Sequence, residues 1–162
     1  MIRVERFPDG VETESGARVV YDVARDEAHF GAARVEGDAL VWELDGLPDG
    51  EWLVRCDRVD FPPGGVAYRH THPGPGVRVL LKGRISIETG GESHEYGPFE
   101  SWYESGPEPV LATASADEET AFVRVLLLPV EWEGKRTIRY VDPADEEKPK
   151  LQRARVYFER RL

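Results

Sequence analysis

Residues 64–83, GGVAYRHTHPGPGVRVLLKG, contain the pattern on which the fold prediction rests. His70 and His72 lie one residue apart in this stretch, which ends in an apolar run and Gly83. Side chains of an extended strand alternate between its two faces, so both imidazoles project from the same face. Imidazole is a common metal ligand, and two of them on one face can converge on one ion. The stretch therefore predicts a β-strand that carries metal ligands.

Short apolar runs separated by turn residues continue on both sides of this stretch. They cover residues 19–23, 39–44, 52–59, 77–81, 85–87, 121–128 and 155–158. Gly and Pro clusters such as Pro62-Pro63-Gly64-Gly65 lie between them. Many short strands with such turns predict an all-β sandwich or barrel. Only residues 24–33 are expected to form a helical turn or two, because the 16 Gly and 12 Pro argue against long helices.

Length and charge narrow the class of protein. A chain of 162 residues is long enough for one domain with a real core. Its net charge of −10 argues against nucleic acid or an anionic membrane as a partner, since both attract clustered Lys and Arg. Cys56 is the single cysteine, so no internal disulfide forms, and we interpret it as a half-buried strand thiol rather than a nucleophile. Residues 1–6 lack an apolar signal segment, and we expect a cytoplasmic protein.

The pattern of Gly64, His70, His72 and Gly83 resembles the first motif of the cupin superfamily. The resemblance covers about residues 64–129 and implies a small antiparallel β-barrel of the jelly-roll type, often dimeric, with a divalent metal inside the barrel. We therefore expect one domain over residues 1–162, with its motif core at 64–129. Residues 142–150 are expected to be a solvated charged connector. The strand-like extension at 151–162 would pair with the barrel edge or with a second subunit, and we expect a homodimer.

Two of the four usual ligands of the resembled family are absent. Counting back from Gly83, Gly76 stands where cupins carry the glutamate of the first motif. The second motif resembles residues 99–106, and its histidine would fall near Pro109. Glu104 is the remaining acid in that segment, and with His70 and His72 it would make a facial set of two histidines and one carboxylate. Such a set suits Fe, Mn, Ni or Zn, while the alternative is that the histidines line an empty polar barrel.

Three further side chains are candidates for the site. If Gly76 faces inward, Arg78 faces inward with it and needs a partner, which is a substrate carboxylate or Glu104. In the opposite register Val77 and Val79 are buried and Arg78 lies in solvent, and both registers remain open. Trp102 is assigned with Arg78 to ligand binding. Tyr68 shares the predicted histidine face and is assigned, with Glu104, to catalysis.

Two functions from different classes follow. The first is a cupin-type metalloprotein that acts on a small organic molecule as an oxygenase, isomerase or lyase. The second is a cupin without catalysis that binds a small ligand as a sensor or storage module. Retention of the histidine pair favours the first, and loss of two usual ligands favours the second.

Overall fold

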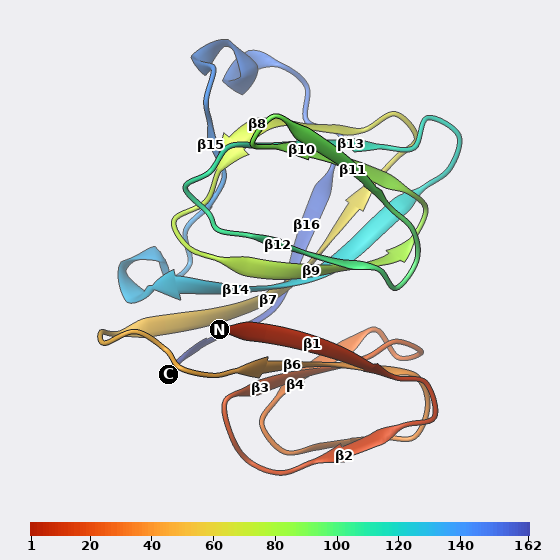
Figure 1. Cartoon of the computed structure of the whole chain (residues 1–162), viewed down its shortest axis with the longest axis vertical. Helices are drawn as coiled ribbons and strands as arrows, with labels where there is room; N and C mark the ends of the chain where they lie inside the picture. Colours follow the sequence, from red (N-terminus) through yellow and green to blue (C-terminus); the bar gives the residue numbers. More distant parts are fainter.

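Antiparallel β-strands make up most of the computed structural model, which describes residues 1–162 (Figure 1). Three large sheets are present, together with a small two-stranded one. Helical structure is confined to two short 3-10 helices, η1 (Val130–Trp132) and η2 (Pro143–Glu147). The all-β fold class is therefore confirmed. No helix of the structure has the length and apolar character needed to cross a lipid bilayer.

The N-terminal sheet is a separate layer below the barrel in Figure 1. Its strand order is β1 (Ile2–Phe7), β6 (Ala39–Leu44), β3 (Arg18–Asp22) and β4 (Glu27–Phe30). The pair β2 (Val11–Thr13) and β5 (Ala33–Val35) lies beside it. The predicted helical turn at residues 24–33 is wrong: β3 and β4 form a hairpin instead. Asp26 has a φ of 55° in its turn, which permits the tight reversal.

Two five-stranded sheets form the barrel. The middle sheet has the order β12 (Ser101–Glu104), β9 (Gly76–Lys82), β14 (Thr120–Pro129), β7 (Trp52–Phe61) and β16 (Arg153–Arg161). The outer sheet has the order β11 (Glu92–Tyr96), β10 (Ile85–Thr89), β13 (Val110–Ala114), β8 (Val66–Thr71) and β15 (Arg139–Tyr140). The C-terminal extension pairs with β7 in the same chain, which is one of the two predicted alternatives.

The middle sheet is buried on both faces, which decides where its alternating side chains go. On one face, Val77 and Val79 belong to a core shared with the N-terminal sheet. On the other face, Leu80 packs in a second core inside the barrel, and Arg78 lines the barrel cavity. Arg78 thus faces inward. The alternative register buried Val77 and Val79 and placed Arg78 in solvent. Val77 and Val79 are buried, because the N-terminal sheet covers their face, but Arg78 is buried as well, on the barrel face.

Candidate functional site

A cavity of about 970 Å³ lies inside the barrel. Seven Lys and Arg side chains line it against four carboxylates, although the whole chain has a net charge of −10. The charged lining residues are Arg55, Arg78, Arg124, Lys135, Arg136, Lys148 and Lys150, with Asp57, Glu104, Glu146 and Glu159. Five of these cations form ion pairs with carboxylates, and Lys135 and Lys150 have no carboxylate partner, so the cavity keeps an excess of positive charge that attracts anions.

Strand register places the innermost charges in one row across the middle sheet. Asp57 on β7 lies opposite Arg124 on β14, and Arg124 lies opposite Arg78 on β9. Trp102 on β12 continues the row beyond Arg78. Because residues directly opposite in a sheet project from the same face, these four side chains meet inside the barrel.

Arg124 and Asp57 form a buried bidentate ion pair. Arg124 Nε donates to Asp57 Oδ1 at 2.7 Å, and its Nη2 donates to Oδ2 at 3.0 Å. Burial disfavours the charged guanidinium, but the adjacent Asp57 outweighs it and raises the pKa of Arg124. Sequence reasoning missed this pair, although a single Arg inside the apolar run 121–128 was a signal for an inward charge.

Arg78 is 1% exposed and pairs with Glu104, as one of the predicted alternatives held. Its Nη2 lies 2.5 Å from Glu104 Oε2, and Trp102 Nε1 donates to Glu104 Oε1 at 3.2 Å. Burial lowers the pKa of Arg78 to about 10, against the opposing effect of Glu104, so the guanidinium stays charged at neutral pH. Arg78 Nη1 is buried without a hydrogen-bond partner. A buried donor left unpaired costs about 1–3 kcal/mol.

Arg55 forms a third buried pair, near one end of the cavity. Its Nη2 lies 2.5 Å from Glu159 Oε1 on β16. The same nitrogen donates to the carbonyl oxygens of Trp132 and Lys135 at 3.1 and 2.9 Å. Arg55 therefore ties the segment after η1 to the barrel, which brings residues 134–138 to the cavity.

His70 and His72 come together as predicted and both line the cavity. Their ring centroids are 4.9 Å apart. His70 Nδ1 lies 2.7 Å from the carbonyl oxygen of Tyr68, which can only accept, so Nδ1 carries a proton there. His72 Nδ1 bonds Thr137 Oγ1 at 3.1 Å, while its buried Nε2 has no partner.

Both imidazoles are held in the neutral form. Burial is the main cause that lowers the pKa of His70. Burial also lowers the pKa of His72, and the charges of Arg124 and Arg78 lower it further. A neutral imidazole has one donor and one acceptor nitrogen, so this side of the cavity makes hydrogen bonds without adding charge.

Tyr68 does not line the cavity, although the alternation of an ideal strand would place it beside the histidines. On β8 two residues separate Ala67 from His70, whereas on β13 only one residue separates their partners Ala112 and Val110. This bulge puts both Ala67 and His70 on the cavity side. The ring of Tyr68 instead has Lys148 Nζ 4.8 Å from its centroid. The structure thus brings His70, His72, Arg78, Trp102 and Glu104 together at the cavity and leaves Tyr68 outside it.

The segment predicted to be a solvated connector contributes to the cavity. Lys148 and Lys150 line it, and Asp145 within η2 is buried beside Lys148. Asp145 Oδ1 lies 2.6 Å from Lys148 Nζ. Seven of the nine residues 142–150 are exposed, as expected of a solvated connector, while Asp145 is buried where the pairing of β15 with β8 brings the segment to the barrel.

The residues present do not make the predicted metal site. The structure shows no group of three His, Cys, Asp or Glu side chains arranged to hold a metal ion. Glu104 is engaged by Arg78 and Trp102 rather than free to join the histidines. Arg78 itself is a fixed positive charge on the site, and it opposes a divalent cation. His70, His72 and Glu104 as a ligand set remain a prediction that would need this ion pair to open.

Comparison with known proteins supports the family resemblance. Residues 57–123 match the model of the Cupin_2 family, described as a cupin domain. No curated protein has a matching sequence.

Several solved structures are similar to this chain. A cupin-like protein from Thermotoga maritima is 17% identical, covers 61% of this chain and 82% of its own, and has a TM-score of 0.48. The polyketide cyclase RemF from Streptomyces resistomycificus is 18% identical, covers 62% and 71%, and has a TM-score of 0.45. A protein of unknown function from Rhizobium leguminosarum is 26% identical, covers 51% and 84%, and has a TM-score of 0.41. Likenesses this distant do not indicate a ligand or a reaction.

Proposed function

The chain belongs to the cupin superfamily, and we propose that it binds a small organic acid inside its barrel. The observation that carries this proposal is the charge of the cavity: seven cationic side chains against four carboxylates in a chain of net charge −10. The ligand's negative charge would be attracted by this excess. This is the ligand-binding function among the two that the sequence left open.

The cavity wall also suggests the form of the acid. Along β7, the cavity-lining residues change from Arg55 and Asp57 to Val59 and Phe61. Phe122 lies opposite Val59 on β14, so the neighbouring strand changes in the same direction. One end of the cavity is therefore charged and the other apolar. An acid with an aliphatic or aromatic body matches both ends.

Calorimetric titration with matched acids and amides tests the proposal. We expect 3-phenylpropionate and hexanoate to bind at least about tenfold more tightly than their amides, a difference of about 1.4 kcal/mol. The change Lys135→Gln at the cavity should weaken acid binding about threefold through the lost charge. Lys82→Gln is the matched control, because Lys82 pairs with Glu119 outside the cavity lining. Equal affinity for acids and amides, or no binding of either acid, would overturn the proposal.

A metal-dependent enzyme of the oxygenase, isomerase or lyase type is the second candidate. The observation that favours it is the histidine pair at the cavity, with ring centroids 4.9 Å apart. It requires Glu104 to leave Arg78 and act as ligand or catalytic group, and it gives Tyr68 a role only if β8 shifts. Stoichiometric retention of Fe, Mn, Ni or Zn after dialysis of reloaded protein would favour this candidate. Complete loss of all four would count against it.

A further inference from the structure

We propose that the guanidinium of Arg78 replaces the divalent metal of the family as the cation that holds the ligand's carboxylate. The inference rests on the proposed function, since it names the group that receives the acid. It makes this barrel a binding site that works without metal. Two independent features support it. Gly76 leaves space for the guanidinium, and the acid near the histidines, Glu104, is paired with Arg78.

Gly76 makes room for Arg78. A Cβ added at residue 76 would lie 2.8 Å from Arg78 Nη1, 2.6 Å from Leu126 Cδ2 and 2.9 Å from the carbonyl oxygen of Val125. A glutamate at this position, where the first cupin motif carries one, would therefore displace the guanidinium. The guanidinium of Arg78 therefore fits inside the barrel only because residue 76 is a glycine and not the glutamate of the first cupin motif.

This change also removes one acid from the surroundings of the histidines and pairs another, Glu104, with a guanidinium. Glu104 is the acid within reach, and Arg78 binds it at 2.5 Å. Arg124 lies opposite Arg78 in the sheet and adds a second fixed cation. Both guanidinium groups are paired with carboxylates, Arg78 with Glu104 and Arg124 with Asp57, so neither acid is free to hold a divalent ion beside the histidines, while the unpaired donor of Arg78 can bind an anion.

Arg78 keeps donors for a ligand after it has paired with Glu104. A guanidinium carries five N–H donors, and Arg78 contacts Glu104 through Nη2 alone. Nη1 is buried and has no partner. His72 also lines the cavity, and its buried Nε2 has no partner. A carboxylate that accepts from Nη1 would satisfy the buried donor, with its apolar body toward Val59 and Phe122.

Metal binding provides the first test. Wild-type protein treated with chelator and then dialysed against Mn²⁺ or Zn²⁺ should retain less than about 0.1 equivalent. Arg78→Met frees Glu104, and this variant should retain at least about fivefold more metal. Arg78→Lys keeps a charge beside Glu104 and should fold if Arg78→Met does not, and it should exclude metal as wild type does. Stoichiometric metal in the wild type, or in Arg78→Lys, would overturn the inference.

Ligand binding provides the second test, on metal-free protein with 3-phenylpropionate. Arg78→Lys should weaken binding about tenfold or more, because a lysine offers one point charge instead of a planar set of donors. Arg84→Lys is the matched control, since Arg84 pairs with Glu95 at the surface, outside the cavity lining. Gly76→Ala should also weaken binding about tenfold by displacing Arg78. Gly37→Ala, at a glycine with open space around it, should not.

The outcomes separate this inference from the function it rests on. If wild-type protein binds no acid of the panel, the proposed function fails, while the metal measurements still decide whether Arg78 excludes metal. If acids bind but Arg78→Lys matches Arg84→Lys, the function stands and the role of Arg78 is wrong. Acid binding that appears only after metal is added would also overturn the inference.

Discussion

At the scale of single residues, the barrel interior depends on paired charges whose removal is costly. Asp57 is 2% exposed and its partner Arg124 is held by two hydrogen bonds. A buried ion pair contributes little net stability compared with apolar residues of similar volume, but a charge that loses its partner is expensive. Loss of one partner is therefore expected to cost more stability than loss of both.

Removal of one partner of this pair gives a stability prediction. Arg124→Met leaves Asp57 buried without a cation, and we expect the free energy of unfolding to fall by about 3–5 kcal/mol. Arg124→Met combined with Asp57→Leu removes both charges and should recover most of that loss. Urea unfolding followed by tryptophan fluorescence measures both. Arg84→Met, at an exposed ion pair, is the control and should change stability by less than about 1 kcal/mol. Equal losses in the single and double variants would contradict the prediction.

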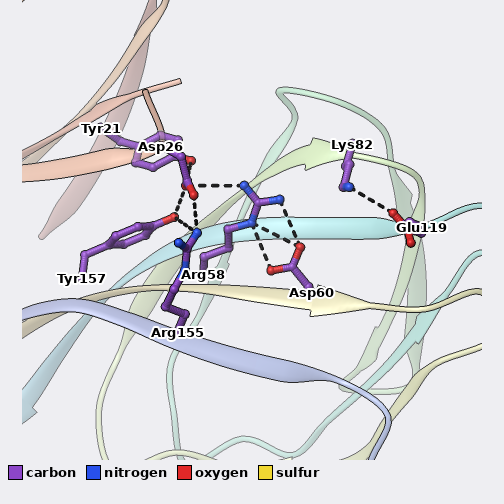
Figure 2. Close-up of polar contacts among 8 residues, drawn as sticks. All are labelled: Tyr21, Asp26, Arg58, Asp60, Lys82, Glu119, Arg155 and Tyr157. Carbon is purple, nitrogen blue, oxygen red and sulfur yellow. Dashed lines mark hydrogen bonds and ion pairs between the residues drawn. The ribbon is translucent and has the colours of Figure 1, made fainter. Parts of the chain in front are cut away.

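At the scale of elements, the turn between β3 and β4 fastens the N-terminal sheet to the barrel. Figure 2 shows the Asp26 carboxylate facing Tyr157, Arg155 and Arg58. Tyr21, on β3, donates to Asp26 Oδ1 at 2.5 Å. The turn thus reaches both β7 and β16, which are far from it in sequence.

The pKa of Asp26 makes this contact sensitive to pH. Burial raises the pKa of Asp26, but hydrogen bonds from Tyr157, Tyr21 and Arg155 outweigh it and lower the pKa to about 2. A folded-state pKa below the unfolded value near 3.9 contributes stability above about pH 4, and this contribution is lost as the pH falls toward 2.

Asp26→Asn tests the contact without changing the turn, because Asn tolerates positive φ. We expect the variant to lose about 1–2 kcal/mol of unfolding free energy at pH 7. The difference from wild type should shrink as the pH falls from 4 to 2. Urea unfolding at several pH values measures it, with Asp117→Asn at an exposed turn as control. A difference that stays constant down to pH 2 would show that the charge of Asp26 is not responsible.

At the scale of the whole molecule, the three layers leave one long strand at an open edge. In Figure 1, β16 crosses beside β7, and its other side pairs with no strand of the chain. The strand has nine residues, and its Val156 is 50% exposed. Long open edges promote pairing with another chain.

A homodimer is therefore still predicted, with β16 at or near the contact. Light scattering at micromolar concentration should give twice the 18.3 kDa mass of one chain. The same measurement across a hundredfold dilution checks whether the assembly is stable. A single-chain mass at the highest concentration would make the prediction wrong.

The sequence by itself determined the fold class and most of the long strands. The apolar runs 39–44 and 121–128 became β6 and β14, because local alternation and turn residues depend only on neighbours along the chain. The spacing of His70 and His72 also predicted that both lie on one face of their strand, and both line the cavity. The hairpin at residues 24–33 was not predicted, since its strand is stabilised by pairing with β3 rather than by its own pattern.

Tertiary structure alone decided the chemistry of the cavity. The partner of Arg78 depended on strand register, because Glu104 lies opposite Gly76 on a strand more than 20 residues away in the chain. The bulge that turns Tyr68 away from the cavity depends on the pairing of β8 with β13. The second face of β9 is buried because the N-terminal sheet packs against it. Charges separated in sequence interact through space, and only packing determines which of them share one cavity.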